Sequence, residues 1–335
     1  MSKPLISIVS PFKNTAEFLP ECLESICNQT YKHWELLIVD DHSSDNSFDL
    51  VKSYANNDPR IKLFRNEGSG IIDALQTAFS KSSGEYITRM DSDDIMATEK
   101  LSCMLNDLLT NGKKHVALGL VKYFSDAGIS EGYAKYETWL NKLTKKGTNY
   151  SEIYKECVIA SPCWMVHRDD FIACDAFNPN RYPEDYDLTF RFYKYNLKCI
   201  PTNHLLHFWR DYSTRTSRTH EHYALNHFLE LKIHYFLELN YDASRPLTIW
   251  GAGNKGKTAA KLLKKANIPF YWICDNPKKI GKEIYGMELS NFDQLKSLEN
   301  PQSIITVANS KEQKRIKNYF ENLGMQSMID YFFFC

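Results

Sequence analysis

Carboxylate clusters are the residues of this chain whose types and spacing most directly indicate chemistry. Asp91 and Asp93 stand two positions apart, with Asp94 beside them, directly after a short apolar run. Two carboxylates at this spacing can bind a hard divalent cation, Mn²⁺ or Mg²⁺, and leave coordination positions open for diphosphate oxygens. Acidic loops are also common as solvated surface, so the triplet alone leaves both interpretations open.

A second acidic pair, Glu184 and Asp185, precedes an apolar and aromatic segment at 188–195 that predicts a helix. One of the two could be a general base that accepts the proton of an attacking hydroxyl. An acidic first turn is equally expected at any helix, because it faces the positive end of the helix dipole. His207 leaves a similar choice between a metal ligand and a packed side chain.

Strands and helices that would position these carboxylates alternate along the first hundred residues. Apolar runs at 5–10 and 35–39 predict buried strands, segments at 61–64 and 85–89 predict two further strands, and the intervening segments predict helices at 16–27, 48–55 and 71–80. Ser44 is the expected N-cap of the second helix. This order predicts an α/β fold with a mostly parallel central sheet, in which Asp40 and Asp41 share the ligand-binding carboxyl edge with Asp91–Asp94.

A glycine turn near the C-terminus indicates a second β–α–β unit. Gly251, Gly253 and Gly256 lie between a predicted strand at 247–250 and a predicted helix at 257–266, and Asp275 follows the central glycine by 275 − 253 = 22 residues. This context matches the dinucleotide fingerprint, in which the turn holds a pyrophosphate and the acid binds a ribose hydroxyl. Close helix–strand packing would explain the glycines equally well, and the polar turn at 276–281 could face a phosphate or solvent.

Length and hydrophobic pattern predict two domains joined by a helix. We expect a catalytic domain at 1–219, a helical connector at 220–245 and a small Rossmann-like domain at 246–335. About 80 residues follow the glycine turn and show no dehydrogenase-like catalytic set, so a hydride-transfer enzyme is not expected.

Charge and cysteine content exclude several classes of function. Lys+Arg and Asp+Glu both number 41, which gives no net field to attract nucleic acid. Nine scattered cysteines form no disulfide or zinc pattern and fit a reducing compartment. No signal peptide pattern occurs and no apolar run approaches the ~20 residues that span a bilayer. We therefore expect a cytoplasmic protein whose association with a membrane would be peripheral, at its inner face.

Several motifs occur in a fixed order along the first 220 residues. They are IVSPFKN at 8–14, LESICNQT at 23–30, WELLIVDDHSSD at 34–45, NEG at 66–68, GEYITRMDSDD at 84–94 and ED at 184–185. Through them the chain resembles glycosyltransferase family 2. The resemblance implies a GT-A fold, a nucleotide-sugar donor such as a UDP-sugar, and inversion at the anomeric carbon. Two departures, Lys13 in place of an aromatic residue and the sequence IIDAL at 71–75, leave donor contacts from that helix open.

The resemblance also implies roles for individual residues. Donor-binding roles fall on Ser10, Pro11, Asn14, Asp40 and Asp41 for the nucleoside, on Asp91, Asp93 and Asp94 for the metal and diphosphate, and on Arg210 for a diphosphate clamp. Asp185 would be the catalytic base and Glu184 would orient a substrate.

Three functions therefore compete. The first is a metal-dependent transferase that extends a glycan or lipid-linked saccharide in cell-surface polysaccharide synthesis. The second is a catalytically inactive nucleotide-binding or regulatory scaffold, against which the intact Asp91, Asp93 and Asp185 argue. The third is an NAD-dependent enzyme that modifies sugar nucleotides, which predicts cofactor binding within 246–335.

Overall fold

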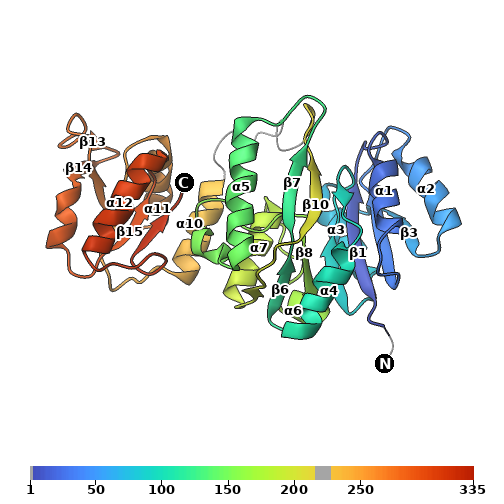
Figure 1. Ribbon diagram of the computed structural model, residues 1–335. Coiled ribbons are helices and arrows are strands. Elements are labelled where there is room, and N and C mark those ends of the chain that lie inside the picture. The colour runs from blue at the N-terminus through green and yellow to red at the C-terminus, as the bar shows by residue number, and fades with distance from the viewer. Residues whose placement is uncertain (1–2, 216–227) are drawn as a thin grey trace. The chain divides into compact units, whose positions relative to one another are not determined.

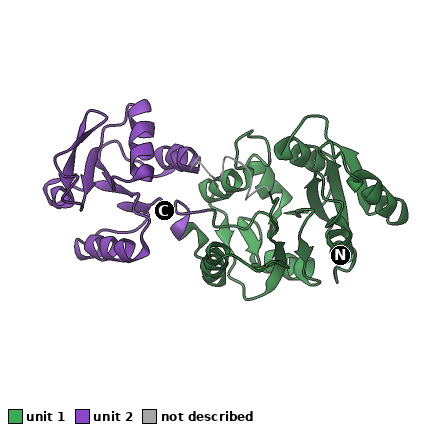
Figure 2. Ribbon diagram, turned by 90° about the horizontal axis from the view of Figure 1, so that it is seen from above, with its two compact units in different colours: residues 1–150, 157–215 green, residues 151–156, 216–335 purple. Residues whose placement is uncertain are grey.

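A computed structural model describes residues 3–215 and 228–335 and divides the chain into two compact units (Figures 1 and 2). Unit 1 comprises residues 1–150 and 157–215, and unit 2 comprises 151–156 and 216–335. The expected boundary at 219 and the first part of the expected connector, 220–227, lie outside the described residues. The remainder of that connector includes helix α10 (Phe228–Leu239). No described helix is both long and apolar enough to cross a bilayer.

The main sheet of unit 1 has the strand order β3-β2-β1-β4-β8-β6-β9. Neighbours are parallel from β3 to β4, whereas β8 runs antiparallel to β4 and β6. The α/β architecture and the parallel core of the sheet confirm the sequence prediction. The strands are β1 (Ile6–Phe12), β2 (Trp34–Asp40), β3 (Ile61–Arg65), β4 (Tyr86–Arg89), β6 (His115–Leu118), β8 (Trp164–His167) and β9 (Lys198–Cys199).

Helices bury apolar stripes against the main sheet. Every residue of β1 and β2 is buried, as expected for strands covered on both faces. Helices α1 (Leu19–Cys27), α2 (Ser47–Asn57) and α4 (Lys100–Asn111) share one hydrophobic core with β1 and β2. Helix α3 (Ile71–Ser80) also contacts β1 and β2. The remaining helices of unit 1 are α5 (Glu131–Lys146), η1 (Asn149–Glu152), α6 (Arg168–Ala173) and α7 (Glu184–Lys194).

Two helix starts differ from the sequence prediction. Ser44 does not cap α2, whose N-cap is Asn46, because the backbone N–H and the hydroxyl of Ser44 both donate to Asn14 Oδ1. Helix α7 begins four residues before the predicted start at 188, so Glu184 and Asp185 belong to its first turn. The second difference matters for the site, because a first helical turn holds its side chains in fixed directions.

A small second sheet in unit 1, β5-β10-β7, lies beyond the acidic loop. It contains β5 (Ile95–Met96), β7 (Leu120–Phe124) and β10 (Leu205–Arg210), with β10 parallel to β7 and antiparallel to β5. The register shifts between Leu205 and His207, where β10 has one more residue than β7. This is a β-bulge, which changes the face on which the following side chains emerge.

Unit 2 is a separate α/β sheet with the order β13-β14-β12-β11-β15-β16. All neighbours are parallel except β13 and β14. Trp250 on β11 packs with Ile316 and Phe320 of α12 in one core. The elements are β11 (Leu247–Trp250), α11 (Asn254–Lys265), β12 (Tyr271–Cys274), β13 (Glu283–Ile284), β14 (Met287–Asn291), η2 (Phe292–Ser297), β15 (Gln302–Ile305), α12 (Ser310–Asn322) and β16 (Tyr331–Phe333).

Candidate active site

Asp91 and Asp93 lie in the acidic loop that follows β4, and one carboxylate oxygen of each accepts a hydrogen bond from another side chain. Asp91 Oδ1 accepts a hydrogen bond from Arg89 Nε at 2.8 Å, and Asp93 Oδ2 accepts one from the Tyr212 hydroxyl at 2.9 Å. Among the described residues, no hydrogen bond reaches the other oxygen of either carboxylate. The pair therefore keeps two acceptor positions for a ligand.

Asp94, in contrast, is fully buried and anchors the loop. Its Oδ2 lies 2.9 Å from His207 Nε2, and its Oδ1 accepts the backbone N–H of Arg210 at 2.8 Å. Burial, reinforced by the charge of Lys100, lowers the pKa of His207 well below its usual value, so the ring is neutral. Since Lys100 Nζ lies 3.5 Å from Nδ1, we assign the proton to Nε2, which donates to Asp94. His207 thus packs behind the loop with both ring nitrogens engaged.

Burial also shapes the electrostatics of the loop. It raises the pKa of Asp93 to about 7, with a further contribution from the neighbouring Asp94 carboxylate, and the pKa of Asp94 rises for the same main reason. The positive charge of Arg215 acts in the opposite direction on both. Burial and mutual repulsion oppose the ionisation of these carboxylates, and a bound cation would favour their ionised form.

Arg89 joins this loop to the second acidic pair. The guanidinium is 4% exposed and donates through Nη1 to Glu184 Oε1 at 2.9 Å while Nε holds Asp91. Asp185 stands beside Glu184, and its Oδ1 accepts the backbone N–H of Tyr186 at 2.7 Å. Burial, followed by the charge of Glu184, raises the pKa of Asp185 to about 7. The structure therefore brings the two predicted acidic groups to one place.

Asp40 and Asp41, at the end of β2, are buried and organise the neighbouring loops. Asp41 Oδ1 accepts hydrogen bonds from Asn66 Nδ2 at 2.7 Å and from the backbone of Gly70 at 2.8 Å. Asp40 Oδ1 accepts the backbone N–H of Ser43 at 2.9 Å. Gly70 has a φ of +90°, a conformation that favours glycine, and it forms the N-cap of α3.

The end of β1 completes this edge of the sheet. Ser10 is 1% exposed, and its hydroxyl has no hydrogen-bond partner within the described part of the chain. Pro11 pairs with Val39 of β2. Asn14 is exposed and connects the loops after β1 and β2 by accepting the backbone N–H of Ser44 at 2.8 Å. An unsatisfied buried hydroxyl is costly, so Ser10 marks a place where a bound ligand could supply a partner.

Arg210 lies at the acidic loop, but its side chain is engaged within the protein. Its Nε donates to the Asp93 carbonyl at 2.8 Å, its Nη2 pairs with Glu21, and the guanidinium lies 4.5 Å from the Phe124 ring centroid. Arg215, five residues further, is the cation whose charge acts on Asp93 and Asp94.

Sequence reasoning did not single out Arg89, Lys100 or Tyr212 as functional, whereas Arg215 lies within 213–217, a segment that the family resemblance implies can close over the diphosphate. Arg89 lies two positions before Asp91, and a basic residue so close to the acidic cluster was the available indication. Lys100 could not be found from sequence, because its partners Pro162 and His207 are distant along the chain.

A divalent cation fits this donor set. Asp91 and Asp93 offer one open carboxylate oxygen each, and among the residues described no group of three or more His, Cys, Asp or Glu side chains is arranged to hold a metal ion by itself. Two protein carboxylates completed by substrate phosphate oxygens are the usual arrangement for Mg²⁺, which does not need an all-protein cage.

The glycine turn of unit 2 is a second candidate site, separate from these carboxylates. Gly251 has a φ of +127°, and a Cβ on Gly256 would lie 2.1 Å from the Gly251 carbonyl oxygen. Asp275 is exposed directly after β12.

Comparison with known proteins gives a family match for unit 1. Residues 7–174 match the model of the family described as Glycosyl transferase family 2. The chain is 39% identical over 114 residues to an uncharacterized glycosyltransferase of Haemophilus influenzae, which covers 33% of this chain and 45% of that protein. It is 32% identical over 195 residues to UDP-Glc:alpha-D-GlcNAc-diphosphoundecaprenol beta-1,3-glucosyltransferase WfgD of Escherichia coli, covering 56% of this chain and 69% of that protein. The first relative is thus matched over less than half of its length.

Solved structures share the fold at low sequence identity. A crystal structure of residues 1–349 of S. aureus TarS in complex with UDP-GlcNAc aligns with a TM-score of 0.55 at 18% identity, covering 77% of this chain and 71% of that one. The mannosyltransferase PcManGT from Pyrobaculum calidifontis, in complex with GDP-Man and Mn²⁺, aligns with a TM-score of 0.50 at 16% identity, covering 78% of this chain and 70% of that one.

Proposed function

The chain belongs to glycosyl transferase family 2, and on that premise we propose that it is an inverting glycosyltransferase that uses a nucleotide-diphosphate sugar and a divalent cation. The donor we propose is a UDP-sugar, which the names of two similar proteins include: UDP-Glc for WfgD and UDP-GlcNAc for the TarS complex. The acceptor we propose is a hydroxyl of a glycan or lipid-linked saccharide in cell-surface polysaccharide synthesis.

Donor binding would use the carboxyl edge of the main sheet. The nucleoside would lie near Ser10, Pro11, Asn14, Asp40 and Asp41, because the ends of β1 and β2 meet there and the Ser10 hydroxyl lacks a partner among the described residues. The diphosphate would lie against the acidic loop, beside Asp94, with Asp91 and Asp93 holding the cation. Arg210, whose Nε donates to the Asp93 carbonyl, would clamp the diphosphate, and the charge of Arg215 would add to the positive potential at the acidic loop.

Sugar transfer would be a single displacement. The ionised carboxylate of Asp185 takes the proton of the acceptor hydroxyl, whose oxygen forms a bond to the anomeric carbon. The bond from that carbon to the diphosphate breaks on the opposite face, so the configuration inverts and a nucleoside diphosphate leaves. A cation held by Asp91 and Asp93 would stabilise the negative charge that develops on the departing diphosphate. Glu184, held by Arg89, would orient the reacting sugar beside the base.

One observation carries this proposal: Arg89 binds Asp91 through Nε and Glu184 through Nη1. The donor-side and acceptor-side carboxylates are therefore neighbours around one guanidinium. Such a constellation supports an active transferase over an inactive scaffold, because each carboxylate that the reaction needs is present. We further propose that the enzyme works in the cytoplasm, with peripheral association at the inner face of the membrane when its acceptor is lipid-linked.

The test is Mn²⁺-dependent hydrolysis of a panel of nucleotide sugars by the purified protein. We expect release of nucleoside diphosphate from at least one donor, abolished by EDTA and reduced roughly 10³-fold or more in Asp93→Ala. Asp126→Ala, at an exposed turn position of the same unit, is the matched control and should retain full activity. Equal hydrolysis by Asp93→Ala, or no metal-dependent turnover of any donor, would reject the proposal in favour of the scaffold.

A further inference from the structure

Unit 2 has the strand order that creates a ligand site at a defined point. Taken in chain order, its five parallel strands β11, β12, β14, β15 and β16 are arranged 3-2-1-4-5. The connection from β11 leads to β12 on one side, and β15 lies on the other side of β11. In an open parallel sheet, ligands bind outside the carboxyl ends of the strands where the order reverses, which here is beside the end of β11.

The glycine turn at this point has the contacts that a phosphate site needs. Gly251 and Gly256 are required by packing, because a Cβ on either would come within 2.5 Å of another atom. Gly253 is different, since its Cβ would meet nothing within 4 Å. Gly253 is also the N-cap of α11, a helix of 12 residues with no side-chain cap. The turn is therefore open where backbone N–H groups and the helix dipole favour an anion.

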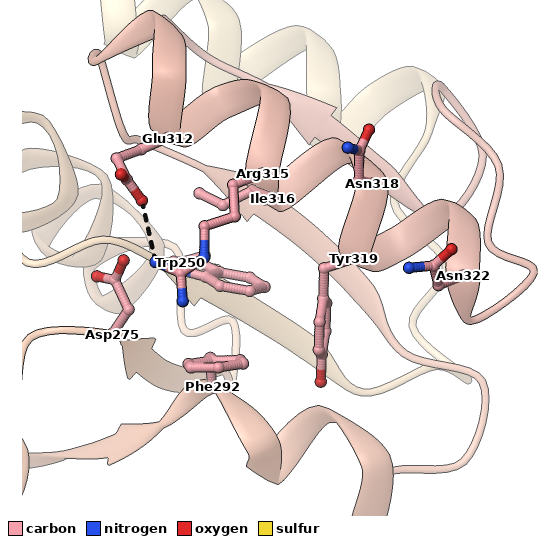
Figure 3. A pocket seen from close by; sticks show the side chains of 9 residues that line it. All are labelled: Trp250, Asp275, Phe292, Glu312, Arg315, Ile316, Asn318, Tyr319 and Asn322. Carbon is pink, nitrogen blue, oxygen red and sulfur yellow. Dashed lines mark ion pairs between the residues drawn. The ribbon is translucent and has the colours of Figure 1, made fainter.

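A cavity lies at the end of β11, where Trp250, the residue directly before the glycine turn, is part of its lining. It has a volume of about 470 Å³ and is lined by Trp250, Phe292 and Tyr319 together with Asp275 and Arg315 (Figure 3). Trp250 and Phe292 stack with ring centroids 5.1 Å apart, and Tyr319 meets Trp250 edge-on at 5.5 Å. The indole Nε1 of Trp250, a residue that is 2% exposed, has no hydrogen-bond partner within the described residues. An aromatic wall with an unsatisfied donor suits a nucleobase.

Two charged side chains from the segment after β12 contact these places, Asp275 at the cavity and Lys279 at the glycine turn. Asp275 follows β12 and lines the cavity, in the position where an acid can accept hydrogen bonds from ribose hydroxyls. Lys279, from the polar turn after Asp275, donates through Nζ to the Ala252 carbonyl at 2.8 Å. The ammonium group is thus held at the glycine turn, where it can reach a phosphate.

We propose that unit 2 binds a nucleoside diphosphate group with an unmodified ribose diol, either as a free nucleotide or as half of a dinucleotide. The diphosphate lies at Gly253 and the N-terminus of α11, beside Lys279. The ribose contacts Asp275, whose negative charge disfavours a 2′-phosphate. The base enters the aromatic cavity. This site is independent of the transferase proposal, because every residue that forms it belongs to unit 2.

The experiment is isothermal titration of the full chain carrying Asp91→Asn and Asp93→Asn, in EDTA, so that cation-dependent donor binding in unit 1 is absent. The probes are ADP, UDP, NAD⁺, NADP⁺ and pyrophosphate. We expect one saturable site for at least one nucleotide diphosphate, with NADP⁺ at least ~10-fold weaker than NAD⁺ if the dinucleotide is the ligand. Tight binding of ADP or UDP without NAD⁺ would identify the free nucleotide.

Matched variants locate the site. Gly253→Val should weaken binding at least ~10-fold without disturbing the fold, because the Cβ position is open and only the phosphate space is filled. Lys279→Met should weaken binding, whereas Lys282→Met, an exposed lysine of the same region, should not. Absence of saturable binding of all five probes up to ~1 mM would overturn the proposal. Unchanged affinity in Gly253→Val with an intact circular dichroism spectrum would overturn it equally.

Discussion

Arg89 Nη1 lies 2.9 Å from Glu184 Oε1, although 95 residues separate the two along the chain. Arg89 belongs to the last position of β4, and Glu184 begins α7. With Asp91 on its other side, the guanidinium uses its fork geometry to hold two carboxylates in a fixed relation. The arginine therefore connects the part of the site proposed for the donor with the part proposed for proton transfer.

We expect Arg89→Lys to lower kcat/KM for sugar transfer by roughly 10- to 100-fold. A lysine keeps the positive charge but cannot bridge Asp91 and Glu184 as the guanidinium does. Steady-state kinetics with the best donor would measure the effect. Arg60→Lys makes the same exchange in a more exposed arginine–carboxylate pair, with Asp58, outside the acidic motifs, and should leave kcat/KM unchanged. Full activity in Arg89→Lys would show that the bridge is dispensable.

The pH profile should report the ionisation of Asp185. Burial raises its pKa to about 7, and the base must be ionised to accept a proton, so kcat/KM should fall below about pH 7. The charge of Glu184 contributes to this raised pKa, and so Glu184→Gln should move the acid limb to lower pH while it reduces the maximal rate. Initial rates between pH 5 and 9 at saturating Mn²⁺ would test both. An acid limb that moves to higher pH in Glu184→Gln would contradict the assignment.

Acid stability should depend on Glu35, a buried residue of β2. Its pKa is lowered to about 2: burial opposes ionisation, but hydrogen bonds from Lys62, Ser7 and Ser83 outweigh it. Because the folded-state pKa lies below the ordinary value of 4.5, the stabilisation is complete above about pH 4.5 and is lost as pH falls towards 2. Urea unfolding of the wild type and Glu35→Gln should therefore differ most above pH 5 and converge in acid. Lys62→Met should reduce this pH dependence. If the unfolding free energies of the wild type and Glu35→Gln changed in parallel with pH, the prediction would be wrong.

Gly253 and Gly256 of the unit 2 turn should differ sharply in their tolerance of a methyl group. Gly256→Ala places a Cβ 2.1 Å from a backbone oxygen that cannot move freely, and we expect a loss of about 2–3 kcal/mol in the unfolding free energy. Gly253→Ala should change it by less than ~0.5 kcal/mol. Hydrogen exchange of residues 246–335 would measure both, and equal losses would refute the distinction.

Sequence patterns predicted the parallel strands and the shared edge because both depend on local order. Buried strands such as β1 and β2 are apolar runs, and consecutive β–α units place Asp40 and Asp91 at the same edge. The family assignment likewise followed from short motifs whose order survives in sequence.

The other features of the candidate site depend on contacts between residues far apart in the chain, which local sequence patterns do not indicate. Helix α7 starts at Glu184, four residues before the start that the apolar period predicts at Leu188, so both acids lie within its first turn. The engagement of Arg210 by Glu21 joins residues 189 positions apart, and no spacing rule indicates it. Lys100 is a buried lysine whose partner is the Pro162 carbonyl, an environment that a charged residue on a helix does not suggest.

The bulge in β10 makes the residue count of that strand a determinant of the active site. His207 and the N–H of Arg210 both contact the Asp94 carboxylate, and both follow the point where one additional residue shifts β10 relative to β7. Removal of Leu206 would restore a regular ladder and reverse which side chains face the acidic loop. An insertion or deletion in β10 would therefore alter the positions of side chains at the acidic loop, although the type of every residue proposed to touch a substrate would stay the same.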